Sequence, residues 1–184
     1  VASAIPYARR GAKLVWADID IGSTVVTVET ISEKITSKTK AIIVVHLYGL
    51  CAEMEEIMVL AQKHNILVIE DCAQALGSSY KNKKCGTFGH ISIFSFHAQK
   101  NITTLGEGGM IVTTVPEFAE KIPGLRHNGH RSFSSSRKYY WQPAMVDVDF
   151  DIESVWPHNY SIGEAQCALG VSLMKRLDEI NERR

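Results

Sequence analysis

The chain has 184 residues, of which 45% are hydrophobic and 22% charged, and its 20 basic residues balance 20 acidic ones. This length favours one domain that can bury a core of its own. The zero net charge argues against a nucleic-acid-binding protein, and apolar runs such as residues 41–45 are too short to cross a bilayer. No secretory leader opens the sequence. We therefore expect a soluble, cytoplasmic protein that binds neither nucleic acid nor membranes.

The first predicted elements are a helix that ends at Gly11 and a strand over residues 13–18. A short helix is expected over residues 27–35, although its β-branched residues disfavour it. Residues 41–46 form a continuous apolar run rich in β-branched side chains, which is typical of a strand covered on both faces.

A helix is predicted over residues 53–64, with Asn65 as its C-terminal cap, and a buried strand over residues 66–70 follows. Later strands are expected at residues 91–96 and 110–114, and later helices at residues 116–122 and from Ile162 onward. An amphipathic period continues over residues 171–180. This alternation of strands and helices predicts an α/β fold with a mostly parallel sheet in three layers, with helices on both faces.

Residues 124–157 differ in character, because they combine basic and serine residues with a cluster of aromatic ones at Tyr139, Tyr140 and Trp141. A loop of this length is usually functional or mobile. Its basic part, residues 126–138, either steers a diphosphate-bearing substrate or is simply solvated. The chain begins without Met and ends inside a helical pattern that has no stop signal, so we expect an excerpt of a longer polypeptide.

The cysteines and histidines are scattered along the sequence. No CxxC pair is present and a chain of this length does not need disulfides, so we expect free, buried thiols at four positions: Cys51, Cys72, Cys85 and Cys167. His127 and His130 stand three residues apart, but no second ligand pair lies at the spacing of a zinc site. We interpret these histidines as exposed loop residues and expect no metal site.

Two charged residues follow buried strands, and ligands of parallel sheets gather beyond the carboxyl ends of the strands. Lys100 is either a solvated surface residue or a desolvated amine that bonds to a carbonyl cofactor. Asp71 either caps a following helix or holds the protonated nitrogen of a pyridine ring. Ser92 and Ser95 are either tolerated strand residues or phosphate-binding hydroxyls.

The glycine-rich run at Gly106, Gly108 and Gly109 matches neither the dinucleotide-binding fingerprint nor the P-loop. Its glycines are more consistent with a close approach of backbone to a ligand, or with a tight entry into a strand.

Taken in order, three segments resemble the DegT/DnrJ/EryC1/StrS family of pyridoxal-phosphate-dependent sugar aminotransferases, which have fold type I. They are EDCAQALG at residues 70–77, FSFHAQKN at residues 94–101 and GEGGM at residues 106–110. Residues 11–13, 45–49, 159–160 and 166–170 match as well, so the resemblance covers nearly the whole chain except about residues 124–157.

The resemblance implies that the chain is part of the large domain of such an enzyme. Residues 1–123 would form the core of the cofactor-binding domain, residues 124–157 a polar basic loop, and residues 158–184 a helix leading toward a small C-terminal domain. The family's phosphate cup and ring-stacking aromatic would lie upstream of Val1. The family also implies a homodimer with shared active sites.

Five residues of the chain match the family's functional positions. The resemblance makes Lys100 the catalytic lysine, which holds pyridoxal phosphate covalently and later acts as general base. Asp71 would pair with the pyridine nitrogen, which lets the ring accept electrons, Gln74 would lie near the ring oxygen, and Ser95 would bind the phosphate. Asn159 would reach the phosphate of the neighbouring subunit's cofactor.

The chain departs from the family at two places. Leu105 is inserted between Thr104 and Gly106, so the roles of Thr103 and Thr104 as ligands do not carry over directly. Ser161 stands where an arginine is common, so the contact made by that arginine in the family does not carry over to this chain.

The leading hypothesis is an aminotransferase that moves an amino group, from glutamate, to a keto group of a nucleotide-linked deoxysugar. A dehydratase-type member using the same cofactor is one alternative, but in such members a histidine replaces the lysine that is Lys100 here. A catalytically silent fragment, or a regulatory binding module with an inherited fold, is the other.

Overall fold

The computed structural model of the chain describes residues 2–130, 148 and 151–184. The described chain forms two compact units: residues 1–112 together with 165–184, and residues 113–164. Most of the predicted basic loop, including Tyr139, Tyr140 and Trp141, lies outside the described residues.

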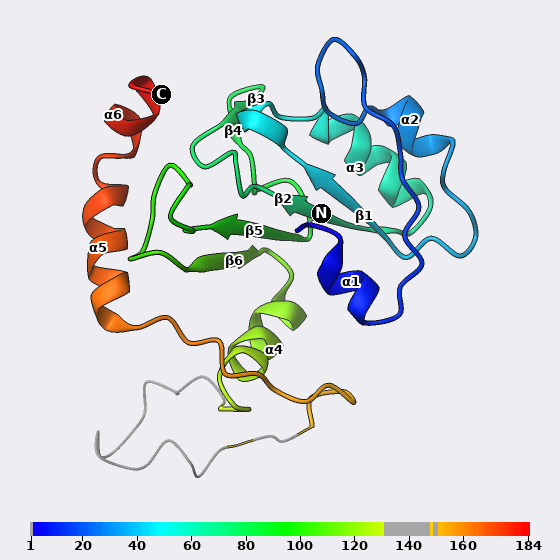
Figure 1. Cartoon of the computed structure of the whole chain (residues 1–184). Coiled ribbons are helices and arrows are strands. Elements are labelled where there is room, and N and C mark those ends of the chain that lie inside the picture. The colour runs from blue at the N-terminus through cyan, green and yellow to red at the C-terminus, as the bar shows by residue number, and fades with distance from the viewer. Residues whose placement is uncertain (1, 131–147, 149–150) are drawn as a thin grey trace. The chain divides into compact units, whose positions relative to one another are not determined.

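A four-stranded sheet carries the first unit, in the order β1 (Ala41–Val45), β2 (Leu67–Asp71), β5 (Ile91–Ser95) and β6 (Gly109–Thr113). β1, β2 and β5 are parallel, and Figure 1 shows β6 running in the opposite direction. A separate antiparallel ribbon pairs β3 (Ser79–Tyr80) with β4 (Lys83–Lys84). The mostly parallel sheet with flanking helices confirms the predicted α/β class.

The core of this unit lies between the sheet and α3 (Met54–Lys63), which packs against β2. Met54, Ile57 and Ala61 recur at helical spacing and are all fully buried, together with Val44 and Val68 of the strands and other apolar residues. An amphipathic helix is stabilised mainly by burying such an apolar face.

The cap predicted at the end of α3 is present. Asn65 adopts a left-handed backbone with φ of 53°, and the N–H of Ile66 bonds back to the carbonyl of Ala61 at 2.9 Å. This closure satisfies carbonyls at the helix end that would otherwise have no partner.

The strand predicted over residues 13–18 is wrong. Residues 13–18 belong to no strand, and Val15 and Trp16 are 59% and 70% exposed. Nearby only an isolated antiparallel bridge joins Ile19 to Val26. β-Branched and aromatic residues favour a strand only where a neighbouring strand and a buried face are available. Two short helices flank this segment, α1 (Ile5–Arg9) and α2 (Val28–Ser32).

The later helices differ from their predicted limits. α4 (Pro116–Arg126), in the second unit, continues past Ile122 and through Pro123. The continuous helix expected over residues 171–180 is instead two helices, α5 (Glu164–Met174) and α6 (Leu177–Glu182). The helix breaks at Lys175 and Arg176. Beyond the break α6 contacts a distant part of the chain, since the Asn181 side chain donates to the carbonyl of Leu76 at 2.9 Å.

Within the part of the chain that the structure describes, no helix is both long and apolar enough to cross a membrane.

Gly109 lies at the start of β6, where the glycine run predicts a tight entry into a strand. A Cβ atom on Gly109 would lie 2.8 Å from the carbonyl oxygen of Phe94, which is backbone and cannot move aside. We expect Gly109→Ala to lower the free energy of unfolding by about 1–3 kcal/mol, as measured by urea denaturation. The matched change Met110→Ala, at a residue that is 55% exposed, should cost about 0.5 kcal/mol or less. Equal stability of the two variants would contradict this account.

Candidate active site

The carboxyl ends of β1, β2 and β5 lie at one edge of the sheet, because these strands are parallel. Val45 pairs with Asp71, and Asp71 pairs with Ile93, so Ser95 follows two residues beyond the last paired position of β5. Lys100 lies in the loop that begins at this edge. The structure thus brings Asp71, Ser95 and the Lys100 loop to the edge where parallel sheets bind ligands.

Asp71 is a buried carboxylate, only 5% exposed. Its Oδ1 accepts the N–H of Ala73 at 3.0 Å, but the residues that follow form turns, so the helix that Asp71 was expected to cap is absent. Among the described residues no cationic side chain forms a salt bridge with Asp71. A buried carboxylate with so few donors is suited to a cationic ligand group.

The phenol of Tyr7, in α1, interacts electrostatically with this carboxylate. Burial raises the pKa of the Tyr7 phenol, and the negative charge of Asp71 raises it further. Tyr7 therefore stays neutral at physiological pH. The proximity of α1 to Asp71 was not predicted, since nothing local to residues 5–9 indicates it.

Gln74 lies three residues after Asp71 and is exposed. Its Oε1 accepts the N–H of Tyr48 at 2.9 Å, in the short 3₁₀ helix η1 (Leu47–Gly49) that follows β1. This contact joins the chain segments that leave β1 and β2, and it holds the Gln74 amide at the same edge of the sheet.

Lys100 is half-buried in the loop between β5 and β6. Two backbone bonds close the base of this loop, from the N–H of Phe96 to the carbonyl of Gly108 and from the N–H of Ala98 to that of Gly106, both at 2.8 Å. The N–H of Lys100 bonds to the carbonyl of His97 at 2.9 Å. The half-buried Ser95 accepts the N–H of His97 at 3.3 Å, and its own hydroxyl proton can be donated to a ligand.

The inserted Leu105 forms a tight turn in this loop. It has a left-handed backbone with φ of 58°, and its side chain is 64% exposed. The Thr103 hydroxyl accepts the N–H of Gly106 at 3.2 Å, while the Thr104 hydroxyl donates to the carbonyl of Glu107 at 2.8 Å. Both threonines therefore build the turn.

Side chains of α5 and α6 brace the loop from a distance in sequence. Gln166 Nε2 donates to the carbonyls of Thr104 and Glu107 at 3.3 and 3.1 Å. Asn101 Nδ2, next to Lys100, donates to Asn181 Oδ1 at 2.7 Å. These contacts span 59 to 80 residues, which is why the sequence alone did not indicate them.

A buried carboxylate next to Asp71 organises this edge of the sheet further. Glu70 Oε2 lies 3.0 Å from His46 Nε2, and both side chains have no exposed surface. The same carboxylate accepts backbone N–H groups of Gly86, Phe88 and Gly89 at 2.7, 2.8 and 2.6 Å. The sequence signal was available, because an ionisable residue inside an apolar strand needs partners.

Burial by itself would raise the pKa of the Glu70 carboxyl. The hydrogen bonds from His46 and from the three backbone N–H groups outweigh burial and place that pKa below its ordinary value of 4.5. Glu70 is therefore ionised at neutral pH and binds the turn after β4 to the sheet.

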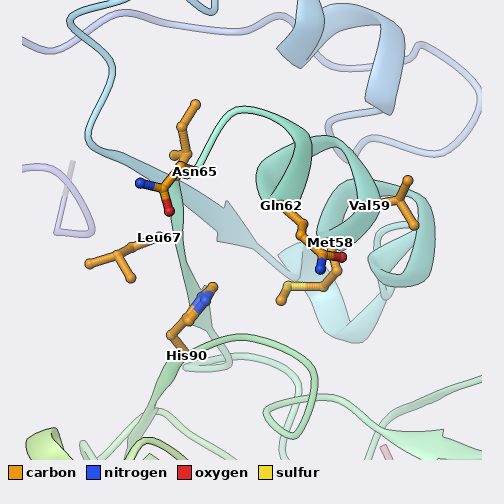
Figure 2. Close-up of a pocket in the computed structure, with 7 residues that line it drawn as sticks. Met58, Val59, Gln62, Asn65, Leu67 and His90 are labelled. Carbon is orange, nitrogen blue, oxygen red and sulfur yellow. The ribbon is translucent and has the colours of Figure 1, made fainter.

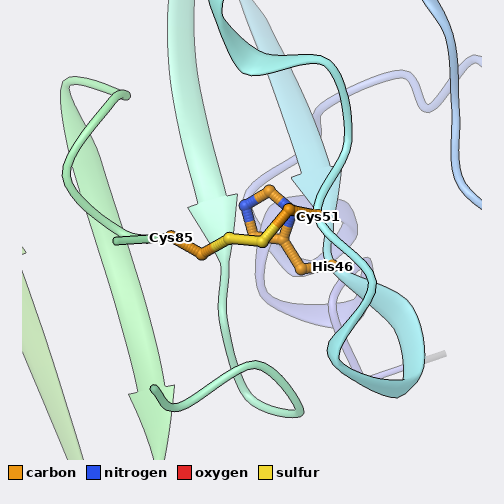
Figure 3. Close-up of side chains that lie close together, drawn as sticks. All are labelled: His46, Cys51 and Cys85. Atoms are coloured by element: carbon orange, nitrogen blue, oxygen red, sulfur yellow. A yellow bond between two sulfur atoms is a disulfide. The ribbon is translucent and has the colours of Figure 1, made fainter. Parts of the chain in front are cut away.

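The prediction of four free, buried thiols is wrong for three of them. Cys51 and Cys85 are joined by a disulfide, with their Cα atoms 6.5 Å apart (Figure 3). Cys167 is free but exposed, and only Cys72 is free and buried. Burial raises the pKa of the Cys72 thiol, so this thiol is unreactive. Sequence separation hid the disulfide, because the partners are 34 residues apart.

The second unit holds the remaining predicted residues. His127 and His130 are half-buried rather than exposed loop residues. Their rings lie 4.7 Å apart, and His127 Nδ1 lies 2.6 Å from the hydroxyl of Ser161. Asn159 forms an isolated bridge with His127.

A pocket of about 330 Å³ lies away from these strand ends (Figure 2). It is lined by α3 and by the residues where β2 begins and where the chain enters β5: Met58, Val59, Gln62, Asn65, Ile66, Leu67 and His90. Because it adjoins the amino ends of the strands, it is separate from the edge that carries Asp71 and Lys100.

The hydrogen bonds of the Glu70 carboxylate should stabilise the fold. Glu70→Gln removes the charge and leaves backbone N–H groups facing an amide, so we expect the free energy of unfolding to fall by about 2–4 kcal/mol at pH 7. The lowered pKa means that this stabilisation is present above pH 4.5 and is lost as the pH falls through the folded-state pKa. The deficit of the variant should therefore shrink on acidification.

Denaturant unfolding of both proteins between neutral and acidic pH measures this deficit. Glu33→Gln, at an exposed position, is the matched control and should change stability by about 0.5 kcal/mol or less. A deficit that grows on acidification would contradict the assigned role of Glu70.

Comparisons with known proteins agree with this architecture. The chain is 38% identical over 182 residues to GDP-perosamine synthase of Escherichia coli O157:H7, covering 99% of this chain and 45% of that protein. It is 50% identical over 119 residues to a UDP-N-acetyl-3-dehydro-α-D-glucosamine 3-aminotransferase of Acidithiobacillus ferrooxidans, covering 65% of this chain and 32% of that protein. The chain thus spans less than half the length of these relatives.

Two solved structures have the same fold. An aminotransferase from Psychrobacter cryohalolentis matches with a TM-score of 0.83 and 35% identity, over 97% of this chain and 44% of that one. The GDP-4-keto-6-deoxy-D-mannose-3-dehydratase of E. coli, with bound hydrated pyridoxal phosphate, matches with a TM-score of 0.76 and 29% identity, over 94% of this chain and 45% of that one. The family model of the DegT/DnrJ/EryC1/StrS aminotransferases matches residues 1–184, and the chain belongs to that family.

Proposed function

We propose that the protein containing this chain is a cytoplasmic, pyridoxal-phosphate-dependent aminotransferase. It transfers an amino group from glutamate to a keto group of a nucleotide-linked deoxysugar. The observation that carries this proposal is a buried carboxylate, Asp71, which forms no salt bridge with any described residue and lies at the same sheet edge as the Lys100 loop. Its support from the comparisons is that relatives named for UDP- and GDP-linked amino sugars match the chain.

The residues at this edge fit the cofactor that the family uses. Asp71 supplies a buried negative charge for a protonated pyridine nitrogen, Gln74 supplies an amide near the ring oxygen, and Ser95 supplies a hydroxyl donor for the phosphate. When bound, pyridoxal phosphate supplies an electron sink that stabilises negative charge on the substrate carbon.

Lys100 carries the chemistry that belongs to the chain itself. Its Nζ would hold the cofactor covalently. Once free, the same amine would act as general base and move a proton at the substrate carbon. The braced loop around Lys100 keeps this amine in reach, because positioning a proton-transfer group is a large part of its effect.

The remaining roles concern the assembled protein. We assign Asn159 to the phosphate of a neighbouring subunit's cofactor, in a homodimer with shared active sites. Residues 1–123 serve as the core of the cofactor-binding domain, residues 124–157 as a polar basic loop, and residues 158–184 as the connection to a small C-terminal domain.

A dehydratase is the second candidate, favoured by the structural similarity to the E. coli 3-dehydratase. Lys100 argues for transamination, since the dehydratase-type members of the family carry a histidine at this position. Product analysis separates the two, because transamination yields an amino sugar and dehydration yields a deoxygenated sugar. Absence of both products would favour a catalytically silent protein.

Replacing Lys100 tests the covalent role directly. In the full-length protein loaded with pyridoxal phosphate, borohydride should fix the cofactor to Lys100, as peptide mass spectrometry will identify. Lys100→Ala should abolish this labelling and lower the transamination rate by at least about 10²–10⁴-fold, because the general base is lost. Lys63→Ala, at an exposed lysine of α3, should leave both unchanged. Labelling of another lysine in the wild-type protein would reject the assignment.

Replacing Asp71 tests the electrostatic role. Asp71→Asn keeps the size of the side chain but removes the charge that would hold the ring nitrogen protonated. We expect kcat for transamination to fall by about 10²–10³-fold while Lys100 remains labelled by borohydride. Asp178→Asn, at an exposed position of α6, is the control. Wild-type kcat in Asp71→Asn would show that this carboxylate has no part in the reaction.

A further inference from the structure

Three side chains from the segments that follow β1, η1 and β4 form a compact group of potential metal ligands. His46 follows β1, Cys51 follows η1, and Cys85 follows β4. One ligand atom from each lies within 4.8 Å of the others, and Figure 3 shows the imidazole beside the two sulfur atoms. His46 and Cys85 are buried, whereas Cys51 is half-buried. The group therefore has a protected interior and one side open to solvent.

The imidazole of His46 is already oriented as in many metal sites. Its Nε2 faces the Glu70 carboxylate at 3.0 Å, and its Nδ1 accepts the N–H of Ala52 at 3.3 Å. In this arrangement Nε2 carries the proton, and Nδ1 uses its one lone pair to accept the long bond from Ala52, which a bound cation would have to displace. Metal-binding histidines commonly donate their second N–H to a carboxylate, which fixes the tautomer and orients the ring.

We propose that, when the Cys51–Cys85 disulfide is reduced, these two sulfur atoms and His46 Nδ1 bind one soft divalent cation of the Zn²⁺ class. Two thiolates and one imidazole form a familiar donor set for such ions, with a fourth position left for water or another ligand.

The Cys51–Cys85 disulfide must be reduced before a cation can bind. A dithiol reductant supplies two electrons and two protons to the disulfide and becomes a disulfide itself, while Cys51 and Cys85 become thiols. Binding of the cation then releases the two thiol protons to solvent. The disulfide and the cation use the same sulfur atoms, so they exclude each other.

A neighbouring group, formed by His46, Glu70 and Cys72, also lies within 4.8 Å. It is less suited to a cation, because the Glu70 oxygens already accept bonds from His46, Gly86, Phe88 and Gly89. Glu70 serves better as the outer partner of His46 than as a ligand. A cation bound by the first group would need Cys51, whereas a cation bound by the second group would need Cys72.

Cobalt binding by the full-length, cofactor-loaded protein tests the proposal. Metal-free samples are prepared with the disulfide intact or reduced by a phosphine, and titrated with Co²⁺. The reduced protein should bind one Co²⁺ per chain with the visible absorption of tetrahedral, sulfur-ligated cobalt, and Zn²⁺ should displace it. The oxidised protein should lack this absorption, because the sulfur atoms of a disulfide are not available as thiolate ligands. Absence of this absorption in the reduced protein would overturn the proposal.

Variants locate the ligands. Cys51→Ser, at the half-buried position, and Cys85→Ser should each abolish the cobalt absorption, whereas Cys167→Ser, at the exposed free cysteine, should retain it. Glu70→Gln should weaken binding by about 10–100-fold. Circular dichroism checks that each variant is folded, and Cys51→Ser decides the question if Cys85→Ser does not fold. Absorption that survives in Cys51→Ser but is lost in Cys72→Ser would assign the cation to the other group and refute the proposal.

Discussion

The parallel pairing of β1, β2 and β5 is the constraint on which the candidate site depends. It places three carboxyl ends at one edge of the sheet, with Asp71 opposite Ile93. Consecutive side chains of a strand point to opposite faces, so a slip of one residue would reverse every side chain of β2. The burial of Val68 and other apolar residues under α3 makes such a slip costly. The packing of the core therefore also determines where Asp71 points.

Glu70 and Asp71 show how adjacent carboxylates in one strand take separate tasks. Glu70 is satisfied by His46 and by three backbone N–H groups of the turn at residues 86–89. Within the described part of the chain, the Asp71 side chain accepts one backbone hydrogen bond, from Ala73, and is left able to receive a cationic group. The structural carboxylate anchors the turn that carries Cys85, while its neighbour faces the ligand edge. Because consecutive side chains of a strand point to opposite faces, Glu70 and Asp71 lie on opposite faces of β2.

The Lys100 loop is held by residues far from it in the sequence. Gln166 and Asn181 bond to it from α5 and α6, and two backbone bonds between its ends close its base. Such support limits the motion of a loop that would otherwise be free to move, which matters for a group proposed to transfer protons. The extra residue Leu105 is absorbed as an exposed left-handed turn, and the loop base is retained.

The sequence by itself determined the elements whose signals are local. Helical spacing of apolar residues predicted α3, runs of β-branched residues predicted β1 and β2, and the order of short motifs predicted the family. Only the tertiary structure decided features that need distant partners. Residues 13–18 have strand-like composition but no neighbouring strand, and the Cys51–Cys85 and His46–Glu70 pairs join residues 34 and 24 positions apart. Local patterns encode backbone preference, whereas pairing depends on the folded chain.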